Sequence, residues 1–86
     1  MSRRLAWTDA AWNDYVHWQG RDKKKLKRIN TLINDVKRSP FEGLGKPEAL
    51  KENLSGFWSR RIDETNRLVY AVDDRFITII SCRYHY

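Results

Sequence analysis

Two residues of this chain could exchange protons with a bound substrate, and several cations lie near them in the sequence. Glu48 could remove a proton as a general base, and His85, with an ordinary pKa of about 6.5, could supply one as a general acid. The nearby cations, on or beside expected strands, are Lys51, Arg61, Arg67 and Arg83. Fixed cations stabilise charge that builds up on a phosphate, and the planar arginine fork bonds two phosphate oxygens at once. A metal-independent ribonuclease needs these groups to activate a 2′-hydroxyl and to protonate the leaving 5′-oxygen.

Each of these residues also has a simpler explanation. Single arginines on the strands of a basic domain are usually just exposed. Terminal residues such as those of the closing run Arg83-Tyr84-His85-Tyr86 are normally frayed, and a tag remnant is a further alternative. The functional hypothesis is that His85 and Tyr86 provide an acid and an aromatic platform at the edge of a sheet.

The sequence offers little support for metal or cofactor chemistry. It has two histidines and one cysteine, and it lacks HExxH and CxxC motifs and clustered carboxylates. The stretch GLGKP lacks the strand, helix and Ser/Thr of a phosphate-binding loop. Cys82 lies in an apolar segment, which predicts a buried structural thiol. We therefore expect no metal and no cofactor.

A run of basic residues in the first third of the chain indicates a polyanionic partner. The run comprises Lys23, Lys24, Lys25, Lys27 and Arg28. A solvated helix face is the ordinary interpretation of such a run. However, the cations occupy the first turns of an expected helix, where the helix dipole disfavours them. No acid lies between Asp22 and Asp35 to pair with them within the helix. Nucleic acid is therefore the expected partner.

Hydrophobic periodicity predicts the elements that position these residues. We expect a strand at 3–7, a helix from Thr8 and Asp9 to Gly20, and a second helix from Asp22 to Ser39-Pro40. A loop should span 40–47, followed by a short strand at 49–51 and by strands at 57–62, 67–72 and 75–84. This order predicts an α+β fold in which two helices cover one face of a small antiparallel sheet and leave the other face free.

Length and composition fit one small basic domain spanning residues 1–86. The net charge is +6, and 41% of the residues are hydrophobic, which argues against disorder. No apolar run approaches the roughly 20 residues that span a bilayer, and we see no signal peptide, so we expect a cytoplasmic protein without membrane contact. Most aromatic residues should belong to the core, namely Trp7, Trp12, Tyr15 and Trp18. Either Phe57 or Trp58 should face inward, because they are consecutive on a strand.

Longer stretches of the sequence resemble a known family. The segments GKPEALKENLSGFWSRRID, NRLVYAV and CRYHY strongly resemble the YoeB toxins of the RelE/ParE superfamily. The resemblance covers essentially the whole chain and implies a microbial-RNase-like fold. It implies a toxin of a type II toxin–antitoxin system that enters the ribosomal A site and cleaves mRNA. The implied partners are a YefM-like antitoxin, the ribosome with its small-subunit RNA, and operator DNA bound only through the antitoxin complex. A homodimer is also implied.

The resemblance also implies roles for individual residues. Glu48 is the expected general base, His85 the general acid and Arg67 the phosphate-stabilising arginine. Lys51 and Arg61 are expected to support Arg67, and Tyr86 to place or stack the nucleotide. Arg83 is a further phosphate-binding candidate because of its position on an expected strand. The reaction is attack of a 2′-hydroxyl on the adjacent phosphate, and the basic second helix contacts ribosomal RNA.

The sequence leaves two alternative functions open. One is a non-enzymatic toxin of the same superfamily that inhibits DNA gyrase, which we would not expect to need Glu48, Arg67 and His85 together. The other is a basic nucleic-acid-binding module, which should tolerate loss of His85.

Overall fold

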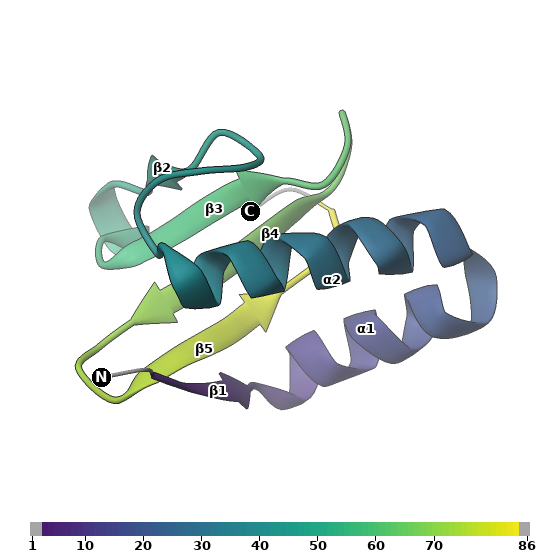
Figure 1. The fold of residues 1–86 in the computed structure, drawn as a ribbon, viewed down its shortest axis with the longest axis horizontal. Coiled ribbons are helices and arrows are strands. Elements are labelled where there is room, and N and C mark those ends of the chain that lie inside the picture. Colours follow the sequence, from purple (N-terminus) through teal and green to yellow (C-terminus); the bar gives the residue numbers. More distant parts are fainter. Residues whose placement is uncertain (1–2, 85–86) are drawn as a thin grey trace.

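The computed structural model describes residues 3–84 as a five-stranded sheet with two helices packed on one face (Figure 1). The elements in chain order are β1 (Arg4–Trp7), α1 (Asp9–Arg21), α2 (Lys23–Arg38), β2 (Glu48–Ala49), the 3-10 turn η1 (Glu52–Leu54), β3 (Phe57–Arg61), β4 (Arg67–Val72) and β5 (Phe76–Ser81). The predicted α+β class is confirmed, and the element boundaries differ from the expected ones by a few residues.

The sheet is mixed, whereas we expected an antiparallel one. The strand order is β1-β5-β4-β3-β2, and the neighbours from β2 to β5 pair antiparallel. β1 pairs with β5 in parallel, with Trp7 opposite Ile79. A parallel pair needs a long crossover connection, and here both helices and three strands lie between the paired segments. Local sequence patterns therefore did not reveal this pairing.

Side-chain caps fix the start of each helix. The Thr8 hydroxyl accepts a hydrogen bond from the backbone N–H of Ala11, as expected for a helix start. The Asp22 carboxylate likewise accepts from the backbone N–H groups of Lys24 and Lys25. Because α1 continues past Gly20 to Arg21, Asp22 alone separates the two helices, which form a tight helical hairpin (Figure 1).

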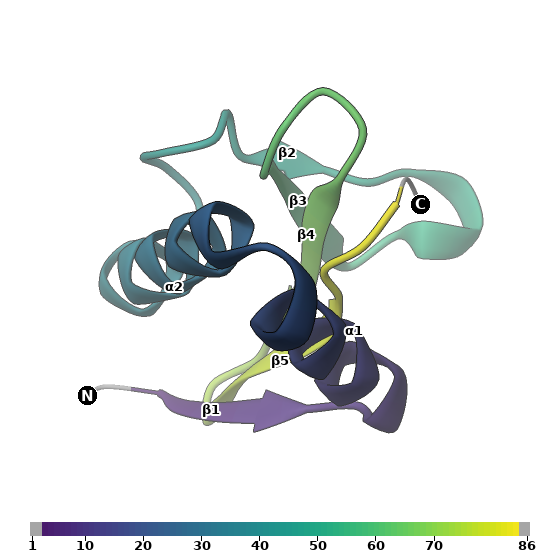
Figure 2. The ribbon, with the colours of Figure 1, turned by 90° about the vertical axis from the view of Figure 1, so that its right-hand side faces the viewer.

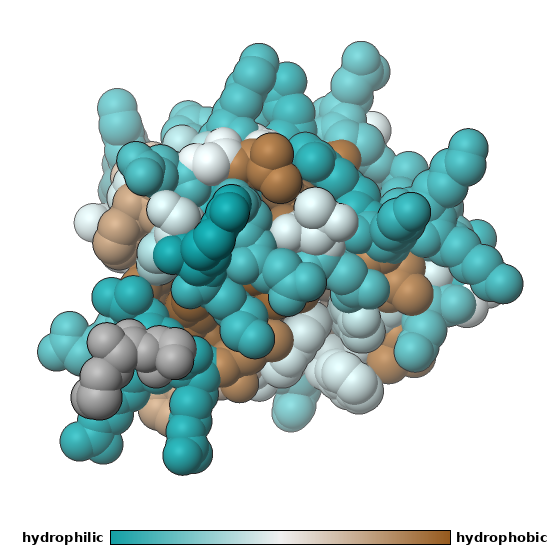
Figure 3. Space-filling view, viewed as in Figure 1, coloured by the Kyte–Doolittle hydropathy of each residue, from teal (hydrophilic) through white to brown (hydrophobic). Residues whose placement is uncertain are grey.

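The core lies between this hairpin and the sheet. Its largest helical contribution comes from the α2 face expected from the sequence, namely Ile29, Leu32, Ile33 and Val36. Trp58 packs against the core, so it is the inward-facing member of the pair with Phe57. Trp12 was expected in the core but is 51% exposed, with its ring stacked on Tyr15 at the surface. In the view of Figure 3 the outer surface is mostly hydrophilic, with small hydrophobic patches.

A buried arginine, which no sequence pattern pointed to, organises the loop before β2. Arg60 has no exposed surface, and its guanidinium lies 2.5 Å from the Asp35 carboxylate. It also donates to the backbone oxygens of Ser39, Glu42 and Leu44. These bonds satisfy a charge that would otherwise be costly to bury, and they attach the 39–47 loop to β3.

Neither helix among residues 3–84 is long and apolar enough to cross a membrane.

Candidate active site on the open face of the sheet

Two of the catalytic candidates, Glu48 and Arg67, lie on the sheet face that the helices leave open. Side chains alternate between faces along a strand, and directly opposite residues on neighbouring strands share a face. Tyr70 of β4 belongs to the core beneath the helices, so Arg67, three residues earlier, faces away from them. Arg61 is opposite Arg67, and Ser59 is opposite Glu48. In Figure 2, α2 lies on one side of the sheet and the segment after β5 lies on the other.

Glu48 and Arg67 form the centre of this site. A carboxylate oxygen of Glu48 lies 3.8 Å from Nη1 of Arg67, which is also 3.4 Å from the Ser59 hydroxyl. The Arg67 side chain is 17% exposed and the Glu48 side chain 58% exposed. The arginine is therefore held by its surroundings, whereas the carboxylate can reach a substrate. A base next to a fixed phosphate-binding cation suits acid–base chemistry on a phosphodiester.

The supporting cations differ in their exposure and in the residues beside them. Lys51 is exposed and lines a shallow hollow together with Glu48. Arg61 is exposed and lies opposite Arg67 on the adjacent strand. Arg83 is half-buried, and its guanidinium lies 4.5 Å from the centre of the Tyr84 ring.

The C-terminal residues assigned to the site, His85 and Tyr86, lie outside the described residues. The residue before them is fixed next to Arg67, because the Tyr84 carbonyl accepts a hydrogen bond of 3.1 Å from the Arg67 backbone N–H. The last described residue is thus bonded to the backbone of Arg67, and the predicted acid is the next residue in the sequence.

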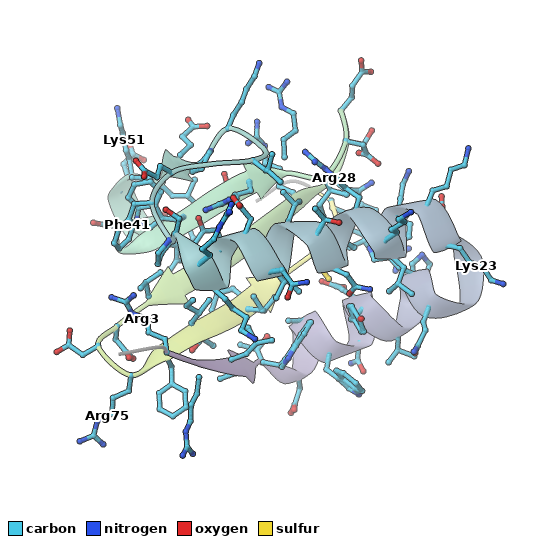
Figure 4. The ribbon with its side chains drawn as sticks, in the orientation of Figure 1. Arg3, Lys23, Arg28, Phe41, Lys51 and Arg75 are labelled. Atoms are coloured by element: carbon cyan, nitrogen blue, oxygen red, sulfur yellow. The ribbon has the colours of Figure 1, made fainter. Side chains whose placement is uncertain are left out.

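The basic run on α2 is not uniform. Lys23, Lys24 and Lys27 are exposed, and Figure 4 shows Lys23 pointing away from the ribbon where the two helices meet. Arg28, also labelled there, donates to the backbone oxygen of Arg61 at 3.1 Å.

Lys25 differs from its neighbours, because its ammonium lies 2.8 Å from the carboxylate of Asp63. The hydrogen bond with Asp63 raises the pKa of Lys25. The Asp22 carboxylate at the start of α2 also lies 3.7 Å from this ammonium, but the nearer partner comes from the turn between β3 and β4, which the sequence did not indicate.

Other candidates prove to be structural. Cys82 is buried, as predicted, and burial together with the nearby Asp14 carboxylate raises the pKa of its thiol to about 12. Within residues 3–84, no three side chains of the metal-ligating types gather in one place.

Sequence reasoning missed two polar residues around the site, Ser59 and Asn66. Both are buried, Ser59 next to Arg67 and Asn66 next to the backbone of Tyr84. Strand alternation could have placed Ser59 on the open face, whereas nothing local indicates the contact of Asn66, 18 residues from its partner.

Known proteins resemble this chain along almost its whole length. A family model described as "YoeB-like toxin of bacterial type II toxin-antitoxin system" matches residues 7–86. Toxin YoeB of Escherichia coli K12 is 60% identical over 83 residues, which are 96% of this chain and 99% of that protein. Toxin YoeB of Synechocystis is 58% identical over 96% of each chain.

Solved structures show the same relationship. The YoeB/ParE toxin from Agrobacterium tumefaciens superposes with a TM-score of 0.92 at 46% identity, covering 96% of this chain and 99% of that one. A YoeB dimer from Staphylococcus aureus gives 0.91 at 47% identity over all of both chains. YafQ from E. coli, at 20% identity and a TM-score of 0.73 over 96% of this chain and 93% of its own, shares the fold. The chain belongs to the YoeB-like toxins of bacterial type II toxin–antitoxin systems.

Proposed function

We propose that this toxin is a ribosome-dependent, metal-independent endoribonuclease that cleaves mRNA in the ribosomal A site. The observation that carries the proposal is the Glu48–Arg67 pair at 3.8 Å on the open face, beside the backbone that leads to His85. A binding module would not need an accessible carboxylate there, because an anion weakens the attraction for phosphate.

In this mechanism Glu48 removes the proton from a ribose 2′-hydroxyl, and the resulting oxygen attacks the adjacent phosphorus. The bond to the 5′-oxygen breaks, and His85 donates its proton to that leaving oxygen. The products are a 2′,3′-cyclic phosphate and a 5′-hydroxyl. Arg67 stabilises the charge on the phosphorane, and Tyr86 stacks on the nucleotide. The supporting cations are Lys51, Arg61 and Arg83.

Four cations of α2, of which Arg28 is half-buried, would bind ribosomal RNA. Lys23, Lys24, Lys27 and Arg28 lie on one helix, and their phosphate contacts would orient the toxin without reading sequence. Lys25 was expected to join them, but we leave it out because of its ion pair with Asp63.

We also propose a YefM-like antitoxin as partner, a homodimer as a further assembly, and the cytoplasm as the place of action. Solved relatives from S. aureus include a heterotetrameric YoeB-YefM toxin–antitoxin complex and a YoeB dimer. Operator DNA would be bound only through the antitoxin complex. Co-purification with the antitoxin and light scattering of the free toxin test both assemblies.

A reconstituted translation reaction tests the activity. Purified toxin is added to programmed ribosomes, and message cleavage is mapped by primer extension. We expect cuts within A-site codons. Glu48→Gln should lower the rate of this cleavage by about 100- to 10,000-fold. Glu64→Gln, at an exposed carboxylate in the turn after β3, is the matched control and should cleave at the wild-type rate.

Other outcomes would point to other functions. Inhibition of translation with an intact message would leave a ribosome-binding protein. No effect on translation would favour the gyrase inhibitor or the simple nucleic-acid-binding module. Equal cleavage of free and ribosome-bound RNA would refute the dependence on ribosomes.

A further inference from the structure

The segment after β5, residues 82–84, is held in place by side chains of α1 and of the turn between β3 and β4. The Trp18 indole N–H of α1 donates to the Cys82 carbonyl at 2.8 Å. The Cys82 backbone N–H donates to the Asp14 carboxylate at 3.1 Å. This segment has no regular structure of its own. Side chains from outside it therefore determine its path.

The last described residue, Tyr84, adopts a left-handed backbone with φ of +64°. Residues other than glycine rarely adopt this conformation, so neighbouring groups must enforce it. The Tyr84 N–H donates to the Asn66 side-chain oxygen at 2.6 Å, and its carbonyl accepts from the Arg67 N–H at 3.1 Å. Both hydrogen-bonding groups of the residue before His85 are thus anchored.

Asn66 is itself oriented by Asp63. The amide nitrogen of Asn66 donates to both carboxylate oxygens of Asp63 at 3.2 Å, which directs the amide oxygen toward Tyr84. The Asp63 carboxylate also accepts from the backbone N–H groups of Thr65 and Asn66. Asn66 is only 5% exposed, so water cannot readily replace these bonds.

Lys25 completes the arrangement from α2. Its ammonium lies 2.8 Å from the Asp63 carboxylate and 5.7 Å from the centre of the Trp18 ring. It therefore contacts two of the residues that act on the C-terminal segment. Desolvation raises the pKa of Asp63, but hydrogen bonds from Lys25, Asn66 and Thr65 outweigh it and lower this pKa, which keeps the carboxylate ionised.

We propose that Lys25, Asp63 and Asn66, here called the C-terminal buttress, position the end of the chain so that His85 can protonate the leaving oxygen. This inference rests on the proposed function, because it assumes that His85 is the general acid. The three are positioning residues that act through the backbone of Tyr84. Lys25 then helps to position the general acid, whereas the adjacent Lys24 binds ribosomal RNA.

Adjacent lysines provide a matched comparison on programmed ribosomes. Lys25→Met, which keeps an unbranched apolar side chain, should lower kcat about tenfold or more at unchanged KM. Lys24→Met should raise KM at unchanged kcat, and it should reduce the slope of log affinity against log salt by about 1. Lys25→Arg keeps the ion pair with Asp63 and should restore kcat.

A message with sulfur in place of the scissile 5′-oxygen isolates the acid step, because a thiolate leaves without being protonated. On this message Asn66→Leu and Lys25→Met should cleave at about the wild-type rate, as should the reference variant His85→Ala. Glu48→Gln should remain slow on both messages. Circular dichroism verifies the fold, and Asn66→Ser serves as the milder variant if Asn66→Leu does not fold.

Each result bears on the inference. If Lys25→Met and Asn66→Leu lose the same fraction of the cleavage rate on the oxygen and sulfur messages, their role is merely structural and the inference is overturned. An increased KM for Lys25→Met at unchanged kcat would also overturn it, and would return Lys25 to RNA binding. If His85→Ala is slow on both messages, His85 is not the general acid, and the role of the buttress fails while the endoribonuclease function stands. If the wild type does not cut at all, the proposed function itself fails.

Discussion

Replacing Asp35 by asparagine removes the negative charge that faces the buried guanidinium of Arg60. The Asp35 side chain is 4% exposed and that of Arg60 is wholly buried. The carboxylate also accepts a hydrogen bond of 2.9 Å from the backbone N–H of Leu44 and pairs with Arg38, whose side chain is largely exposed. An asparagine of the same shape keeps part of this bonding but leaves the charge of Arg60 without a counterion.

The expected loss in free energy of unfolding is large for a domain of this size. Removing one partner of a buried ion pair destabilises a protein by about 3–5 kcal/mol. A chain of 86 residues has a free energy of unfolding of about 4–13 kcal/mol, at roughly 0.05–0.15 kcal/mol per residue. We therefore expect Asp35→Asn to lower the Tm by at least about 10 °C.

Urea unfolding followed by tryptophan fluorescence at pH 7 measures this change. Asp74→Asn, at an exposed turn carboxylate, is the matched control and should change the free energy of unfolding by less than about 0.5 kcal/mol. A loss below about 1 kcal/mol for Asp35→Asn would refute the reasoning, because the pair would then contribute no more than one at the surface.

Acid should reproduce the effect of the substitution in the wild type. Hydrogen bonds from Leu44 and Arg60 lower the pKa of Asp35 to about 2 in the folded protein. Since the unfolded value is about 3.9, this contribution to stability is complete above about pH 4 and is lost as the pH falls toward 2. The Asp35→Asn protein should therefore show a smaller loss of stability across that interval.

Three further predictions concern backbone and thiol chemistry. Gly20→Ala should stabilise the protein by up to about 1 kcal/mol, because Gly20 lies in α1 with no atom within 4 Å of an added Cβ. Gly45→Ala should destabilise the protein by about 1–3 kcal/mol, because the φ of Gly45 is +78° and the added Cβ would lie 2.9 Å from Leu32 and 3.1 Å from the Arg61 carbonyl. Thermal melts measure the stability of both glycine variants. Cys82, with its pKa raised to about 12, should react with a thiol reagent at pH 8 only after unfolding, and rapid labelling of the native protein would contradict its burial.

Local patterns in the sequence were enough to predict much of the fold. The spacing of Ile29, Leu32, Ile33 and Val36 predicted α2 because a helix brings such positions onto one face. Thr8 and Asp22 predicted helix starts because capping involves backbone groups only two or three residues away. Residue chemistry likewise singled out Glu48 and Arg67 before any geometry was known.

Tertiary structure decided which charged residues are internal. Arg60 and Arg61 are adjacent and chemically identical, yet one is wholly buried and the other exposed, because strand alternation turns them to opposite faces. Asp35, the partner of Arg60, lies 25 residues away, so no local pattern could identify the pair. The same reason applies to Lys25 and Asp63, which meet only after α2 has packed on the sheet. Sequence thus determined the elements and the chemical groups, while long-range packing determined which of those groups could act together.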